Sequence, residues 1–100
     1  MENQLPLILI VDDEFINRSM LKRFLKSSAE VIEAEDGYQA LEKVTPETDL
    51  ILLDLMMEGI DGIEVCKRLK ENPRTAEIPV IFISAIDDPK VKAKGLEAGG

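Results

Sequence analysis

Two patterns of apolar and polar positions alternate along this chain. Four short aliphatic runs, rich in β-branched residues, alternate with longer stretches in which apolar residues recur at helical spacing. Continuous short apolar runs are typical of strands buried on both faces, and a spacing of three to four residues is typical of amphipathic helices. The pattern predicts strands over 7–12, 30–34, 50–54 and 80–84, and helices over 15–26, 37–44, 63–71 and 89–98.

The first predicted helix has apolar and charged positions that divide it into two faces. Its apolar members are Phe15, Ile16, Met20, Leu21, Phe24 and Leu25, and its charged members are Arg18, Lys22, Arg23 and Lys26. We expect the apolar set to face the core and the charged set to face water.

The order of the predicted elements indicates a fold class. Strands that alternate with helices imply a parallel sheet covered on both faces through right-handed crossovers. We therefore expect an α/β, doubly wound sheet. The strand order 2-1-3-4 is taken from the known flavodoxin-like arrangement of such sheets and does not follow from the alternation itself. The chain shows no internal repeat and no domain boundary, so residues 1–100 are expected to form a single domain.

Acidic side chains stand where two of the apolar runs end. Asp12 and Asp13 follow the first run, and Asp54 follows the third. Carboxylates at the ends of buried strands are costly in a core and useful at a site. In the expected strand order the first and third strands are neighbours, so three carboxylates meet at one sheet edge. Like charges so close repel, and a hard cation with oxygen ligands such as Mg²⁺ removes the conflict.

A carboxylate beside such a cation can act as a nucleophile toward phosphorus. Asp54 is the candidate, because it stands alone on the central strand while Asp12 and Asp13 form a pair suited to ligation. The Ser84 hydroxyl, at the end of the next strand, is expected to donate a hydrogen bond to a phosphoryl oxygen. Each residue also has a purely local interpretation: Asp13 as a helix cap, Asp54 as the start of a turn, Ser84 as a strand end. The joint placement favours a site.

Composition excludes several other classes of protein. The net charge of −8 speaks against direct binding of nucleic acid or of an anionic membrane. The N-terminus lacks the basic start of a signal peptide, and no apolar run approaches the length of a membrane span. One thiol cannot form an internal disulfide, so a reducing cytoplasm is the expected location. The single cysteine, Cys66, fits a small apolar residue on a helix. The absence of histidine removes histidine-based catalysis and histidine metal ligation.

Six segments together resemble the receiver domain of response regulators in bacterial two-component signalling. They are residues 8–14, 36–41, 53–57, 61–64, 78–85 and 95–99. The resemblance extends over nearly the whole chain and includes the acidic pair, the strand that precedes Asp54, and the Ser84-Ala85 pair.

The resemblance implies a role for each candidate residue. Asp54 would accept the phosphoryl group. Asp12, Asp13, Asp54 and the backbone carbonyl of Met56 would hold Mg²⁺, and Ser84 would be the switch hydroxyl. The donor would be a phosphohistidine on a sensor histidine kinase or phosphotransfer protein. The chain would not be an enzyme beyond promoting its own phosphorylation and dephosphorylation.

The chain also departs from the family pattern. Glu58 stands where the family often has proline. The resemblance also implies that Met56 and Ile86, which are not departures, stand at positions that tune the lifetime of the phosphate. The family's fifth strand, fifth helix and invariant lysine would follow Gly100, so we expect a receiver domain that is incomplete at its C-terminal end. Lys90, Lys92 and Lys94 do not replace that lysine, because they lie on the predicted fourth helix. The fourth strand would then be an exposed edge open to self-association.

Two other functions are open to a chain with these features. A haloacid-dehalogenase-type phosphohydrolase also forms an aspartyl-phosphate on Mg²⁺, but it carries Asp-x-Asp on its first strand, where this chain has Asp12-Asp13. A flavin-binding module of the same fold needs a hydroxyl- and glycine-rich loop for phosphate. The acidic stretch 12–14 would repel that anion.

Overall fold

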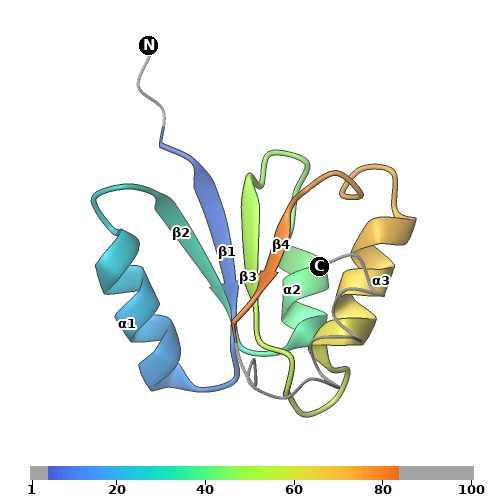
Figure 1. The fold of residues 1–100 in the computed structure, drawn as a ribbon, viewed down its shortest axis with the longest axis horizontal. Coiled ribbons are helices and arrows are strands. Elements are labelled where there is room, and N and C mark those ends of the chain that lie inside the picture. The colour runs from blue at the N-terminus through green and yellow to red at the C-terminus, as the bar shows by residue number, and fades with distance from the viewer. Residues whose placement is uncertain (1–4, 84–100) are drawn as a thin grey trace.

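A computed structural model describes residues 5–83, which form a four-stranded parallel sheet with helices on both faces (Figure 1). The elements are β1 (Leu7–Val11), α1 (Phe15–Leu25), β2 (Glu30–Ala34), α2 (Gly37–Lys43), β3 (Leu50–Leu53), α3 (Gly62–Glu71) and β4 (Val80–Phe82). The strand order is β2-β1-β3-β4, so the predicted fold class and order are confirmed. Ser84, Ile86 and the helix predicted over 89–98 lie outside the described residues.

The pairing register places the ends of β1 and β3 side by side. Val11 is opposite Ala34 of β2 on one side and opposite Leu53 of β3 on the other. Both ladders continue for one more backbone bond: the Asp12 N–H donates to the Ala34 carbonyl at 3.1 Å, and the Asp54 N–H donates to the Val11 carbonyl at 2.9 Å. The aspartates that follow β1 and β3 therefore leave the sheet at the same edge.

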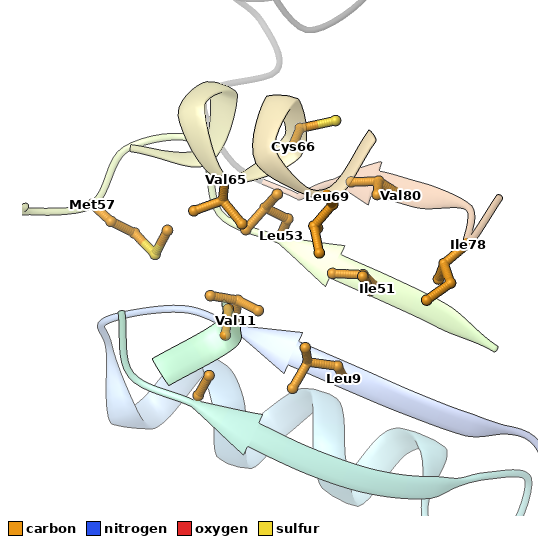
Figure 2. Packing of buried hydrophobic residues seen from close by; sticks show 12 residues of the cluster. Leu9, Val11, Ile51, Leu53, Met57, Val65, Cys66, Leu69, Ile78 and Val80 are labelled. Atoms are coloured by element: carbon orange, nitrogen blue, oxygen red, sulfur yellow. The ribbon is translucent and has the colours of Figure 1, made fainter. Parts of the chain in front are cut away.

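The larger part of the core lies between the sheet and the helices α2 and α3. Leu9, Val11, Ile51 and Leu53 present alternate positions of β1 and β3 to this face and are almost wholly buried. Side chains of α3 project onto these strand residues (Figure 2). Because side chains alternate between the two faces of a strand, a register slip of one residue would move this set out of the core.

Cys66 belongs to the same core, as the prediction of a small apolar residue required. Burial raises the pKa of the Cys66 thiol, and the nearby charge of Lys70 opposes that rise. A buried thiol that stays protonated is inert compared with an exposed thiolate.

The other face of the sheet is covered, within residues 5–83, by α1. Leu21 and Leu25 pack against Ile8 and Ile10 of β1. The prediction that every apolar residue of α1 faces the core and every charged one faces water is wrong. Arg18 is buried, at 7% exposure. The apolar side chains that are exposed instead are Phe15, Ile16, Met20 and, at 83% exposure, Phe24. The helix is turned so that Arg18 reaches hydrogen-bonding partners on the sheet, and these partners make its burial tolerable.

Two aspartates begin the helices on the other face. The Asp36 carboxylate accepts from the Gln39 N–H at 2.8 Å and caps α2, and the Asp61 carboxylate accepts from the Glu64 N–H at 2.9 Å and caps α3. Both satisfy a backbone donor that the helix itself leaves without a partner. Among the described helices, none combines the length and the apolar character needed to cross a membrane.

The first residue of α3 is held directly against the backbone of the loop that follows β3. The Gly62 N–H donates to the Leu55 carbonyl at 3.1 Å. A Cβ atom on Gly62 would lie 2.4 Å from the Asp54 carbonyl oxygen and 2.8 Å from the Leu55 Cα. Only glycine permits so close an approach, and this approach ties the start of α3 to Asp54.

We expect Gly62→Ala to lower the free energy of unfolding by about 1–2 kcal/mol, because overpacking against the backbone outweighs the better helix propensity of alanine. Urea unfolding followed by circular dichroism measures this change. Lys67→Ala, an exposed change on the same helix, is the matched control and is expected to stay within about 0.5 kcal/mol of wild type. Equal unfolding midpoints for Gly62→Ala and wild type would contradict the steric argument.

Candidate functional site

Three aspartates meet at the sheet edge where β1 and β3 end. One carboxylate oxygen from each of Asp12, Asp13 and Asp54 lies within 4.8 Å of the others. Asp12 and Asp54 are 2% and 5% exposed, whereas Asp13 is open to solvent. The structure thus brings together the three carboxylates that the sequence placed at neighbouring strand ends.

Asp12 and Asp54 form the same local turn as the chain leaves each strand. The Asp12 Oδ1 accepts from the Glu14 N–H at 2.9 Å, and the Asp54 Oδ1 accepts from the Met56 N–H at 3.0 Å. An aspartate that accepts from the backbone two residues further on is a common way to start a turn. The local interpretation of Asp54 as a turn residue therefore holds, and it coexists with the acidic cluster because the turn directs the carboxylate to the sheet edge.

The local interpretation of Asp13 does not hold. Glu14, not Asp13, occupies the cap position of α1, and no side chain makes a capping hydrogen bond there. The carboxylate of Asp13 is exposed at the cluster instead.

The electrostatics of the cluster are unfavourable for Asp12. Burial raises the pKa of the Asp12 carboxyl above its usual value, and the charge of Asp54 raises it further. The hydrogen bond from the Glu14 N–H opposes this rise but does not cancel it. Oxygen donors held together against their mutual repulsion are the ligand set that a hard divalent cation takes.

The remaining sequence-predicted site residues are distributed around the cluster or beyond it. Met56 lies two residues after Asp54, with its N–H bound to the Asp54 carboxylate and its side chain exposed. Glu58 is exposed in the loop that precedes α3. Ser84 lies outside the described residues.

A cavity of about 400 Å³ opens beside the acidic edge on the α1 side of the sheet. Its lining is mainly apolar and consists of Asp12, Asn17, Met20, Leu21, Phe24 and Ile83. Asp12 is the member of the acidic cluster that borders it, so the cluster lies at the rim of this hollow.

Sequence reasoning missed one residue that touches the site. The Arg18 Nη1 donates to the backbone carbonyl of Asp12 at 2.7 Å, and its Nε donates to Glu33 Oε1 at 3.1 Å. The prediction assigned Arg18 to the solvent-exposed face of its helix because a charged residue is rarely buried. Glu33 could have indicated the burial of Arg18 from the sequence. It is a carboxylate within the second strand, and a half-buried carboxylate needs a cationic partner.

Comparison with known proteins places this geometry in a family. The family model described as the response regulator receiver domain matches residues 8–100. The chain is 44% identical to Response regulator PleD of Caulobacter vibrioides, over 92% of this chain and 21% of that protein. It is also 44% identical to Transcriptional regulatory protein ResD of Bacillus subtilis, over 92% of this chain and 38% of that protein. The chain thus spans well under half of each of these relatives.

Solved structures agree in fold. A putative response regulator from Chloroflexus aurantiacus is 33% identical, with a TM-score of 0.91 over 97% of this chain and 81% of that one. Chemotaxis protein CheY4 of Vibrio cholerae is 27% identical, with a TM-score of 0.86 over 96% of this chain and 82% of that one.

The haloacid-dehalogenase-type alternative finds no support, because both the family match and the structural similarities point to receiver domains. The acidic cluster also draws on β1 and β3 together rather than on an Asp-x-Asp motif of the first strand. Since the family match runs from residue 8 to residue 100 and the fold agrees over nearly the same span, this chain belongs to the family of response regulator receiver domains of two-component systems.

Proposed function

We propose that this chain is a phosphorylation-dependent switch in which Asp54 accepts a phosphoryl group beside a bound Mg²⁺. The observation that carries the proposal is the cluster of three carboxylates, with oxygens within 4.8 Å of one another, at the edge where β1 and β3 end. Membership of the receiver family, which rests on a match over residues 8–100, supports the same conclusion.

The donor set fits Mg²⁺. Asp12, Asp13 and Asp54 offer carboxylate oxygens, and the backbone carbonyl of Met56 is the fourth protein ligand that we propose. Mg²⁺ takes oxygen ligands, keeps several waters and leaves room for a phosphoryl oxygen, whose developing charge it offsets. A cation also relieves the repulsion to which Asp54 subjects the buried carboxyl of Asp12.

Asp54 is the proposed nucleophile because its neighbours are arranged to ligate rather than to react. Asp12 and Asp13 are adjacent in the chain and offer a pair of carboxylates to one cation, whereas Asp54 stands alone after the end of β3. An Asp54 oxygen attacks phosphorus of a phosphohistidine, the P–N bond breaks, and the imidazole leaves with the bonding electrons. Ser84 is proposed to donate a hydrogen bond to the transferred group.

The proposed partners follow from this chemistry. The phosphoryl donor is a sensor histidine kinase or a phosphotransfer protein in the cytoplasm. The chain turns over no separate substrate and promotes only its own phosphorylation and dephosphorylation. A second copy of this chain is a further candidate partner. Within residues 5–83, β4 is paired with a strand on one side, and its residue Ile81 is 51% exposed. An edge strand of this kind can pair with another chain.

Incubation with acetyl phosphate and Mg²⁺ is expected to add one phosphoryl group, detected by intact-protein mass spectrometry. Asp54→Asn should abolish the adduct, because an amide is not a nucleophile toward phosphorus. Asp49→Asn is the matched control, since Asp49 lies before the start of β3 at the opposite end of the strand and its amide variant can still accept from the Leu7 N–H. An adduct that persists in Asp54→Asn would contradict the assignment.

Saturating Mg²⁺ is expected to raise the thermal midpoint, by an amount equivalent to about 2.7 kcal/mol at one hundred times the dissociation constant. Asp13→Asn should lose at least half of this stabilisation, because it removes one charged ligand while its exposed side chain contributes little to packing. Differential scanning calorimetry with and without Mg²⁺ measures the difference. The same Mg²⁺ response in Asp13→Asn and wild type would count against this ligand.

Without Mg²⁺, Asp12→Asn is expected to unfold at a higher temperature than wild type at neutral pH. The raised pKa of folded Asp12 means that ionisation costs stability as pH rises above the usual range for aspartate. The advantage of the variant should therefore vanish at low pH, where Asp12 is neutral in both states, and grow as pH rises. Asparagine keeps an acceptor for the Glu14 N–H. Thermal melts over a pH series test this, and a difference independent of pH would refute it.

A further inference from the structure

We infer that Arg18 is a positioning residue, which fixes the metal-ligating end of β1 through the Asp12 backbone. The inference rests on the proposed Mg²⁺ site and extends it to a side chain that touches neither the metal nor phosphorus. Arg18 is 7% exposed, and its Nη1 donates to the Asp12 carbonyl at 2.7 Å, a short bond from a charged donor.

The bond acts on both members of the acidic pair. The Asp12 carbonyl belongs to the planar peptide group that joins Asp12 to Asp13, so orienting that plane sets the direction of the backbone at both residues. The register of β1 with its two neighbours ends one residue earlier, at Val11. Arg18 therefore supplies an anchor where the sheet ladder stops.

Three bonds together hold Asp12 in place. Its N–H donates to the Ala34 carbonyl at 3.1 Å, its carbonyl accepts from Arg18, and its Oδ1 accepts from the Glu14 N–H at 2.9 Å. The first ties Asp12 to β2 and the second ties it to α1. Ligands held before the cation arrives lose less freedom on binding it, which raises affinity.

Arg18 is itself held in a fixed geometry. Its Nε donates to Glu33 Oε1 at 3.1 Å, while Lys22 Nζ contacts Glu33 Oε2 at 3.3 Å. The guanidinium carbon of Arg18 lies over the ring of Phe15, 5.7 Å from the ring centroid. A guanidinium can donate to Glu33 and to Asp12 at once because its donors form a rigid fork, whereas a lysine ammonium is a single flexible point charge.

A purely structural role for Arg18 makes a different prediction. If Arg18 only joined α1 to the sheet, its loss would lower stability with and without Mg²⁺ alike and leave the dissociation constant for Mg²⁺ unchanged. If Arg18 positions the acidic pair, the dissociation constant itself increases, even under conditions where the variant is fully folded.

The test is titration of MgCl₂ into folded protein by isothermal calorimetry. Arg18→Met is expected to weaken Mg²⁺ binding about tenfold, in the range seen when the outer partners of metal ligands are removed. Arg18→Lys should weaken it by a similar factor, because it keeps the charge but loses the fork. The controls are Lys22→Met, which removes the other cation at Glu33, and Arg68→Met, which removes an exposed arginine paired with Glu64 on α3. Both are expected to bind Mg²⁺ within about twofold of wild type.

The outcomes separate this inference from the proposed function. Failure of wild type to bind Mg²⁺ overturns the proposed function and the inference together. Binding by wild type with unchanged affinity in both Arg18 variants overturns only the inference. If Arg18→Met does not fold, the Mg²⁺ affinity of Arg18→Lys decides. Glu33→Gln gives a second test, because it weakens the hydrogen bond that holds the Arg18 side chain without altering Arg18 itself. This variant is expected to reduce Mg²⁺ affinity by a smaller factor.

Discussion

The parallel pairing of β1 with β3 is the constraint on which the rest of this structure depends. Because Val11 lies opposite Leu53, the next residues of the two strands, Asp12 and Asp54, emerge together at one edge of the sheet. A shift of one residue would turn one carboxylate away and expose a row of core side chains on the same strand. The packing of α2 and α3 against the strands therefore protects the geometry of the acidic cluster as well as the stability of the fold.

Bringing three carboxylates together costs stability, and the surrounding structure contains the forces that oppose this cost. Backbone donors from Glu14 and Met56 bind the buried carboxylates, and Arg18 binds the backbone between Asp12 and Asp13. These bonds orient the anions but do not outweigh burial and the charge of Asp54, which together raise the pKa of Asp12. Three ordered carboxylates whose mutual repulsion remains favour the binding of a cation. A change of charge at this site changes the electrostatic repulsion at the sheet edge.

Much of the fold could be predicted because its determinants are local. The aliphatic run before Asp54 and the alternation of strands with helices sufficed for the strand positions and the fold class. The meeting of the three aspartates followed only with the flavodoxin-like strand order of known folds. The orientation of α1 could not be predicted in this way. The apolar face of that helix is wide, so periodicity alone does not tell which of its residues contact the sheet and which remain exposed. Burial of Arg18 depends on Glu33, which is distant in sequence and adjacent only after β2 pairs with β1.

The sequence by itself determined where the strands end and which side chains stand at those ends, because hydrophobic runs and the acids that interrupt them are properties of the chain. The similarity of its motifs to receiver domains also determined which aspartate to assign as the acceptor. Only the tertiary structure decided how the acidic edge is held. The bond from Arg18 to the Asp12 carbonyl and the approach of Gly62 to the Asp54 carbonyl join segments through space. Such contacts depend on helix rotation and close packing, which no local pattern of residues encodes.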